Sequence, residues 1–257
     1  MPNNKTLYLL DAMALIYRAY FALNKNPRVN SKGMNTSAIL GFANSLYDIL
    51  KNEDPTHIGV AFDSFAPTLR VGDFTDYKAN RQEMPEDIAN SLPYIKKLLE
   101  GFNIPILEMD GYEADDIIGT LAKKAENEGY TTYMVTPDKD FGQLVSDKIF
   151  MYKPPYMGNK AQILGVKEIC DKYGLKRPEQ VIDILGLWGD ASDNIPGIPG
   201  IGEKTATKLI KEFDSLENLL ENTDKLKGKQ KENVENFAEQ GILSKQLATI
   251  MLDVPVE

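Results

Sequence analysis

Residues 6–11, with the sequence TLYLLD, decide the fold of this chain. The run 6–10 is apolar without alternation, which is typical of a strand buried on both faces of a parallel sheet. Asp11 closes the run, and in open α/β sheets functional sites form at the carboxyl ends of the strands. We therefore expect a parallel α/β sheet that carries Asp11 at its functional edge.

Acids recur where other apolar runs begin or end. Asp63 closes the run at 57–62, and two acids follow the run at 131–136. Crowded carboxylates repel one another, and hard divalent cations such as Mg²⁺ or Mn²⁺ are their natural partners. Such a cluster fits two ions about 3.5–4 Å apart, which would activate a water and steady the leaving oxygen of a phosphodiester. The candidate metal ligands are Asp11, Asp63, Glu113, Asp115, Asp116, Asp138, Asp140, Asp190 and Asp193.

The spacing of apolar residues divides the chain into an α/β body, residues 1–175, and a helical extension, residues 176–257. In the body a βαβ rhythm predicts a mostly parallel sheet flanked by helices. Strands are expected at 6–10, 57–62, 104–108, 131–136 and 148–152, and helices at 36–51, 86–101, 113–128 and 140–145. Later helices are expected at 166–173, 178–188, 203–213, 215–221 and 227–250, the last broken near Gly241.

Composition excludes several kinds of site. The chain has one histidine, His57, and one cysteine, Cys170, so a Ser-His-Asp triad and a zinc centre have little support. A single cysteine also forms no internal disulfide, and the sequence shows neither a signal peptide nor an 18-residue apolar run. We therefore expect a cytoplasmic protein with no membrane partner.

The net charge of −9 does not exclude a nucleic-acid partner. Without the nine candidate metal ligands, the 38 acids fall to 29, which equals the number of lysines and arginines. If those nine acids hold metal ions, the rest of the surface is balanced in charge. Local basic patches can then bind phosphate.

Residues 196–210, PGIPGIGEKTATKLI, resemble a phosphate-binding P-loop, but the lysine stands one position late and no apolar strand precedes the motif. A hairpin between two helices, at about 186–212, explains the glycines better. They allow the backbone to approach a phosphate, which the amides at the start of the next helix bind without reading bases. The expected DNA contacts here are Gly200, Gly202, Lys204, Thr205 and Lys208.

A long polar segment, residues 64–85, follows Asp63. Tyr77, Lys78 and Arg81 are spaced to share one face of a helix, where the cations would clamp the scissile phosphate and the ring would stack on a base. Arg70 lies in the same segment, and Arg18 in the helix after Asp11 is a further candidate phosphate contact.

Six motifs occur in order over almost the whole chain: LLDAMALIYRAYFAL, VAFD, YKANR, GYEADDIIGTLA, TPDKDFGQLVSD and GDASDNIPGIPGIGEKTA. Together they resemble the 5′-nuclease (flap endonuclease) family, and most closely the N-terminal 5′→3′ exonuclease domain of bacterial DNA polymerases I. The resemblance implies a PIN-like core, a helical arch at about 64–90 over the active site, and a helix–hairpin–helix motif. One departure concerns the arch: the bacterial pattern commonly runs His-Glu after the arginine, whereas this chain has Val71-Gly72.

The resemblance also implies roles for individual residues. Asp11, Asp63, Glu113 and Asp115 would hold a first metal, and the remaining acids would serve a second. Arg18, Lys78 and Arg81 match phosphate-contacting cations that assist catalysis, and Tyr77 matches a stacking aromatic. In relatives the hairpin with Gly200 and Gly202 can hold K⁺ against DNA phosphate.

The expected substrates are DNA with a 5′ flap, a nick or an RNA primer, cut by a monomeric domain that a polymerase domain follows in the full-length protein. A stand-alone flap endonuclease is the alternative within the family. Three rivals lie outside it. A phosphatase of the haloacid-dehalogenase type would need an acid where Met13 stands, a PIN-type RNase would not need the 196–210 hairpin, and a non-catalytic flap-binding module would be expected to have lost metal ligands.

Overall fold

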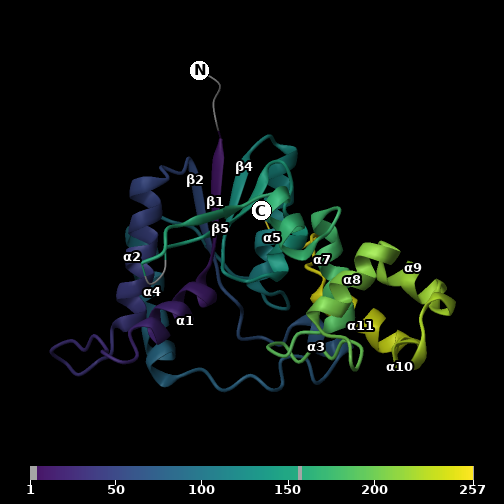
Figure 1. Ribbon diagram of the computed structural model, residues 1–257. Helices are drawn as coiled ribbons and strands as arrows, with labels where there is room; N and C mark the ends of the chain where they lie inside the picture. Colours follow the sequence, from purple (N-terminus) through teal and green to yellow (C-terminus); the bar gives the residue numbers. More distant parts are fainter. Residues whose placement is uncertain (1–4, 156–157, 257) are drawn as a thin grey trace.

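The computed structural model describes residues 5–155 and 158–256, and its centre is a six-stranded sheet in the order β3-β2-β1-β4-β5-β6 (Figure 1). β1 pairs in parallel with both β2 and β4, and only β6, at the edge, is antiparallel. The strands are β1 (Thr6–Asp11), β2 (His57–Ala61), β3 (Ile106–Leu107), β4 (Thr131–Val135), β5 (Ile149–Lys153) and β6 (Gln162–Leu164). The expected parallel sheet is confirmed, and β1 is the strand where its order reverses.

Three helices cover one face of the sheet: α1 (Ala12–Ala22), α2 (Ser37–Asn52) and α4 (Glu86–Gly101). Their buried apolar side chains form one cluster with those of the strands, including Leu10 and Phe42. α1 and α2 approach closely at Gly41, where an added Cβ would lie 2.4 Å from the Cβ of Ala19. The close packing fixes α1, whose first residue follows Asp11 directly.

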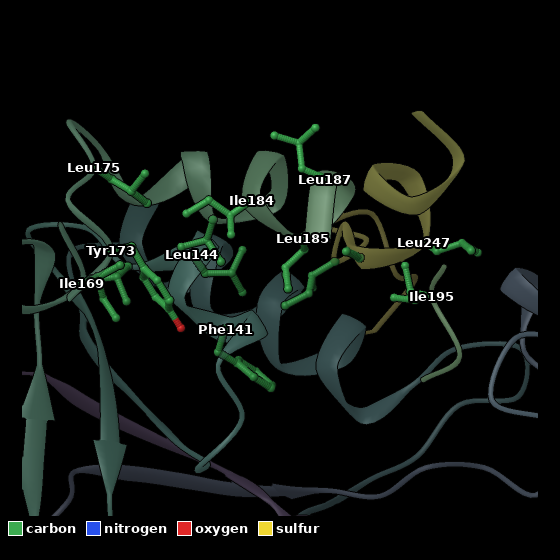
Figure 2. Close-up of a cluster of buried hydrophobic side chains, with 14 of the residues drawn as sticks. Phe141, Leu144, Ile169, Tyr173, Leu175, Ile184, Leu185, Leu187, Ile195 and Leu247 are labelled. Carbon is green, nitrogen blue, oxygen red and sulfur yellow. The ribbon is translucent and has the colours of Figure 1, made fainter. Parts of the chain in front are cut away.

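The second face is covered by α5 (Ala114–Asn127) and the 3₁₀ helix η1 (Asp140–Leu144), and the helical extension packs beside them (Figure 1). The core of the extension is continuous with the core under the sheet. Figure 2 shows Phe141 and Leu144 of η1 in the same cluster as Leu185 and Leu247 of the extension. The helices after the sheet are α6 (Val166–Tyr173), η2 (Pro178–Gln180), α7 (Val181–Trp188), α8 (Glu203–Phe213), α9 (Leu216–Glu221), η3 (Thr223–Lys225), α10 (Gly228–Asn236) and α11 (Ala238–Ala248).

The segment expected to be a helical arch differs from the prediction. Its only helix before α4 is the short α3 (Leu69–Asp73), and residues 75–80 are consecutive turns. Lys78 has a φ of +57°, in the left-handed region, which interrupts a right-handed helix. Tyr77, Lys78 and Arg81 therefore do not share a helix face.

The final helical stretch is broken at Phe237 and not near Gly241. Gly241 lies inside α11, and a Cβ there would lie 3.0 Å from the side chain of Ile198. The approach of α7 to α11 depends on Gly186, because a Cβ on Gly186 would lie 3.1 Å from the carbonyl oxygen of Gly241. Gly241 therefore serves packing, a role that a sequence does not distinguish from a helix stop. None of the helices in the described residues is both long and apolar enough to cross a membrane.

Candidate active site

The carboxyl ends of β1, β2 and β4 bring three acids together. Asp11 is the last residue of β1 and also the N-cap of α1, accepting a hydrogen bond from the Ala14 amide at 3.0 Å. Asp63 lies two residues beyond β2, and Asp138 lies three residues beyond β4. Because β1 is the central strand of the three, the loops that carry Asp63 and Asp138 flank Asp11. This is the switch point where the doubly wound topology predicts a site.

Thr136 links two of these acids and was missed by the sequence analysis. Its hydroxyl donates to Asp11 Oδ2 at 3.0 Å and accepts from the Asp138 amide at 3.1 Å. The threonine thus fixes the carboxylate of β1 against the loop after β4. The sequence did offer a signal: Thr136 ends the apolar run 131–136 and stands two residues before Asp138. A threonine at a strand end is, however, too common to predict such a role.

The N-terminus of α5 adds two more acids. Glu113 is the N-cap residue, and Asp115 stands in the first turn. Asp63 Oδ1 accepts a hydrogen bond from the Ala114 amide at 2.9 Å, so the loop after β2 is tied to the start of α5. The unpaired amides of a helix start favour negative charge, which suits this crowd of carboxylates.

A second group of acids adjoins the first through Asp138. Asp138 Oδ1 accepts from the Asp140 amide at 3.0 Å, at the start of η1. Lys139 forms an ion pair with Asp190, and its ammonium lies 3.6 Å from Asp140 Oδ1. Asp190 Oδ1 also accepts from the Ser192 amide at 2.8 Å. Lys139, which the sequence analysis did not select, therefore joins η1 to the loop after α7.

The predicted cations Lys78 and Arg81 do meet the acids. Lys78 Nζ lies 2.8 Å from Glu113 Oε1 and 3.8 Å from Asp193 Oδ2, and Arg81 Nη2 lies 2.5 Å from Asp193 Oδ1. Their segment is bonded to the loop after α7 along its length. The Lys78 amide donates to the Asp193 carbonyl at 2.9 Å, and the Asn80 side chain donates to the Ala191 carbonyl at 2.7 Å.

Three expected roles are not supported by the contacts. Tyr77 is 5 % exposed and donates its hydroxyl to Glu113 Oε2 at 3.2 Å, so its ring is not free to stack on a base. Arg70 is 4 % exposed and forms two 2.7 Å bonds to Asp116, so it presents no charge to DNA. Asp116 is fully buried and each of its oxygens accepts two hydrogen bonds, which leaves it poorly placed to bind a metal. Arg70 already occupies both carboxylate oxygens of Asp116.

Arg18 lies on α1, and its Nη1 donates to the Pro154 carbonyl at 3.2 Å, beyond the end of β5. The structure thus places Arg18 close to the carboxyl edge of the sheet. Its role as a phosphate contact stays a prediction.

Burial and mutual repulsion raise the pKa values of the central acids. Burial, followed by the charge of Asp63, raises the pKa of Asp11 to about 7. Burial raises the pKa of Asp140 to about 7 as well, with Asp138 as the next cause. The pKa of Asp115 is raised well above its ordinary value by burial and then by Asp138 and Asp11. The site therefore holds more negative charge than its own lysines and arginines neutralise.

One open cavity of about 1230 Å³ is lined by seven of the predicted site residues. These are Lys78, Arg81 and five of the nine candidate metal ligands: Asp11, Asp63, Glu113, Asp115 and Asp138. The rest of the lining is mixed, with Tyr17 and Phe21 from α1 and Leu92 from α4 beside Lys96 and Glu108. The cavity therefore offers acids and cations together with aromatic and aliphatic side chains.

The acidic side chains of the site fit a divalent metal ion in their chemistry but not in their present placement. In the part of the chain that the structure describes, no three His, Cys, Asp or Glu side chains form a group that could hold an ion as they are placed. The chemistry of the donors nevertheless fits a hard cation, because all are oxygens and their repulsion is incompletely neutralised. Asp140 Oδ1 is buried without a hydrogen-bond partner, although Lys139 lies 3.6 Å away. A buried carboxylate oxygen without a partner lowers the stability of the folded protein, and a bound cation would remove this cost.

The hairpin between α7 and α8 stands beside this site. Gly189 and Gly197 both have positive φ, and their backbones cross so closely that a Cβ on Gly197 would lie 2.4 Å from the Gly189 nitrogen. Helices α10 and α11 hold the turn from behind: the Asn233 side chain donates to the Pro199 carbonyl at 2.8 Å, and Gln240 donates to the Gly197 carbonyl at 2.6 Å.

The outer side of the hairpin carries the predicted DNA contacts. Gly200, Gly202, Lys204 and Lys208 are exposed, and Thr205 is half-buried. Gly202 is the N-cap of α8, and an added Cβ there would meet nothing within 4 Å. The start of α8 therefore presents open backbone amides flanked by two lysines, which suits a phosphate. DNA contact at these residues stays a prediction.

An acid-rich cavity at the switch point of a parallel sheet, with cations at its rim and a glycine hairpin beside it, defines the class of the chain as a nuclease. Comparison with known families agrees. The sequence matches the family models "5'-3' exonuclease, N-terminal resolvase-like domain" over residues 6–174 and "5'-3' exonuclease, C-terminal SAM fold" over residues 176–257. The chain belongs to the 5′-3′ exonuclease family.

Curated relatives give the same result. DNA polymerase I of Bacillus subtilis is 47% identical over 259 residues, which covers 100% of this chain and 29% of that protein. The thermostable DNA polymerase I of Thermus thermophilus is 42% identical over 257 residues and covers 100% of this chain and 30% of that protein. The chain thus spans about 30% of the length of these relatives and corresponds to their 5′-3′ exonuclease domain.

Solved structures share the fold. The bacteriophage T5 D15 flap endonuclease, in a complex with DNA and metal ions, superposes with a TM-score of 0.75 at 22% identity, covering 95% of this chain and 89% of that one. The catalytic core of Rad2 in complex with DNA substrate superposes with a TM-score of 0.59 at 18% identity, covering 99% and 81%. Both of these proteins therefore share the fold of this chain.

Proposed function

We propose that this chain cuts 5′ flaps, nicked 5′ ends and RNA primers, by hydrolysis that depends on divalent metal ions. The observation that carries the proposal is one cavity lined by five of the candidate metal ligands, Lys78 and Arg81. Support also comes from the T5 D15 flap endonuclease, which was solved with DNA and metal ions. Mg²⁺ or Mn²⁺ fits the all-oxygen donor set, with two or more ions held.

The resemblance to the 5′-nuclease family divides the acids between two proposed metal positions. Asp11, Asp63, Glu113 and Asp115 would hold the first ion, and Asp138, Asp140, Asp190 and Asp193 the second. When bound, the ions supply a water activated at neutral pH and neutralise the departing oxygen. Asp138 lies within electrostatic reach of both groups, since it raises the pKa values of both Asp115 and Asp140.

The residues of the chain have their own part in the reaction. Lys78 and Arg81 reach the rim of the cavity, where their charge would orient the scissile phosphate and balance the charge that grows on it. Glu113 and Asp193, which hold Lys78 and Arg81 in the structure, are also proposed metal ligands, so the two cations would be available to the phosphate once the acids bind ions. Tyr17, Phe21 and Leu92 in the lining would limit water next to the reacting phosphate. The terminal nucleotides would unpair to enter, since a stacked duplex keeps its phosphate away from the base of the cavity.

The hairpin fixes the duplex in this proposal. The amides at the start of α8, with Lys204 and Lys208, would hold phosphates of the downstream duplex without reading its sequence. K⁺ bound at the carbonyls near Gly200 and Gly202 would add a contact to the same strand. We further propose that the chain acts as a cytoplasmic monomer and, in its full-length protein, precedes a polymerase domain in primer removal and repair.

A flap substrate tests the function. A duplex with a labelled 5′ flap is incubated with the protein in Mg²⁺ or in EDTA, beside a single-stranded RNA of the same length. We expect cutting near the flap junction in Mg²⁺ alone, and a loss on the order of 100-fold in Asp140→Asn, in which a buried ligand oxygen is replaced. Cutting that ignores EDTA refutes the metal mechanism. Cutting of the single-stranded RNA alone would identify an RNase.

A further inference from the structure

The chain segment 247–251, which we name the C-terminal strap, crosses the back of the acid site. It comprises the last two residues of α11 and the three that follow, and its Met251 amide is bonded to Asp116 in the first turn of α5. Leu247 belongs to the same buried cluster as Phe141 of η1 (Figure 2). Polar contacts also hold the strap: two buried side chains, Arg70 and Gln143, each bind its backbone at two positions, and Asp116 and Thr120 of α5 bind it at Met251.

Arg70 is the first of these side chains. Its Nε donates to the Leu247 carbonyl at 3.1 Å and its Nη2 to the Thr249 carbonyl at 2.8 Å. The same guanidinium makes the two bonds to Asp116 in the first turn of α5, and its Nη1 lies 3.5 Å from Glu113 Oε2. One planar group therefore fixes the strap and the helix start that carries Glu113 and Asp115.

Asp116 completes this connection. Its Oδ1 accepts from the Met251 amide at 2.8 Å, and its Oδ2 accepts from the Glu113 amide at 3.1 Å. The carboxylate thus caps α5 and binds the strap at once. Removing one partner of a buried ion pair leaves the other charge uncompensated, so Arg70 and Asp116 hold each other in place.

Gln143 is the second side chain, and it acts on the other group of acids. Its Nε2 donates to the Ala248 carbonyl and to the Asp140 carbonyl, both at 2.9 Å, and its Oε1 accepts from the Ile250 amide at 3.0 Å. Gln143 lies in η1, three residues after Asp140. The strap therefore connects the elements that carry the two proposed metal positions.

We propose that the C-terminal strap is a positioning element of the active site, and that Arg70, Asp116 and Gln143 are its positioning residues. The proposal rests on the metal-dependent function proposed above. The strap sets the distance between the start of α5 and η1, and so the spacing of the two groups of acids. Arg70 and Asp116 serve catalysis through this scaffold, without touching DNA or metal.

The test compares Gln143→Met and Arg70→Lys with a matched control, Lys124→Met. Gln143→Met keeps the volume of the side chain and loses three hydrogen bonds. Arg70→Lys keeps the positive charge and loses the two parallel guanidinium bonds to Asp116. Lys124 lies near the other end of α5, about 15 Å from Glu113 along the helix. It donates to the Val256 carbonyl at 2.6 Å, so the control also removes an attachment of the chain end, away from the acids.

Two measurements without DNA are made on each folded variant: Mn²⁺ binding by electron paramagnetic resonance, and hydrogen exchange at amides 113–116 and 140–144. We expect Gln143→Met and Arg70→Lys to weaken Mn²⁺ binding at least ~10-fold and to speed exchange in both segments. We expect Lys124→Met to lower stability without changing either readout. If Arg70→Lys does not fold, Gln143→Met carries the test alone.

Two outcomes overturn the proposal. One is unchanged Mn²⁺ affinity and unchanged exchange at 140–144 in folded Gln143→Met. The other is an equal loss of affinity in Lys124→Met, which would mean that the strap contributes only general stability. If the unaltered protein binds no Mn²⁺ and cuts no flap in Mg²⁺, the proposed function fails, and the exchange data alone then decide whether the strap orders both elements.

Discussion

Single carboxylates at this site differ in what surrounds them, and the difference assigns their roles. Asp116 accepts four hydrogen bonds, two of them from the Arg70 guanidinium, whereas the buried Asp140 Oδ1 has no hydrogen-bond partner. The first is a satisfied structural acid. The second is strained by burial and by the charge of Asp138. The two acids look alike in the sequence, but only Asp116 is bound by an arginine, and this contact gives the two residues different roles.

Asp140 should make the stability of the metal-free protein depend on pH. Its folded pKa of about 7 lies above the ordinary 3.8, so the folded state binds the proton more tightly. The free energy of unfolding should then fall as pH rises from about 4 to about 7 and stay low above that. Asp140→Asn removes this contribution, and we expect the variant to be more stable than the unaltered protein at pH 8 by up to a few kcal/mol.

Urea unfolding in EDTA at pH 5 and at pH 8 measures this effect. The gap between the variant and the unaltered protein should be larger at pH 8. Asp11, with a pKa raised by burial to about 7, leaves part of the pH dependence in both proteins. A variant that is less stable than the unaltered protein at pH 8 would contradict the buried-charge argument.

At the scale of elements, the hairpin separates glycines that fold it from glycines that face outward. Gly197 has a φ of +61° and would place a Cβ 2.4 Å from the backbone of Trp188 and Gly189. Gly202 has a φ of −92° and open space around its Cα. Both glycines belong to the motif PGIPGIG at 196–202. The path of the backbone therefore decides that Gly197 is needed for folding and that Gly202 faces outward.

We expect Gly197→Ala to affect mainly the stability of the fold and Gly202→Ala to affect mainly the affinity for flap DNA. Gly197→Ala should lower the free energy of unfolding by about 2 kcal/mol or more, because strain and overlap act together. Gly202→Ala should cost less than about 1 kcal/mol at this N-cap but should weaken binding of flap DNA, since the methyl group occupies the space for a phosphate. Thermal unfolding and fluorescence anisotropy in EDTA separate the effects. Unchanged DNA affinity in Gly202→Ala would remove this glycine from the interface.

For the molecule as a whole, the net charge of −9 must be reconciled with a DNA substrate. Acids line the cavity beside Lys78 and Arg81, whereas Lys204 and Lys208 are exposed on the hairpin side of the extension. DNA phosphates would therefore meet the lysines, while divalent ions would neutralise the acids before the scissile phosphate enters. Binding and cutting should depend on different parts of the surface.

The salt dependence of binding tests this separation. If Lys204 and Lys208 each meet one phosphate, the double variant Lys204→Ala/Lys208→Ala should bind flap DNA more weakly and lower the slope of log K against log salt by about 2. Lys51→Ala, on the far helix α2, serves as the control and should leave the slope unchanged. Anisotropy titrations in EDTA at several salt concentrations give the slopes. An equal change in both variants would show a diffuse attraction and no hairpin site.

The sequence by itself determined the parallel sheet, the acids at its carboxyl edge and the hairpin, because strand burial, helix periodicity and glycine turns are local in their causes. The tertiary structure alone decided that Asp116 is taken by Arg70, that Tyr77 is buried on Glu113, and that the segment with Lys78 turns where a helix was expected. It also revealed Thr136, Lys139 and Gln143 as the links between the acids. Their partners lie up to 125 residues away along the chain, as Thr136 and Asp11 do, so no local pattern contains them.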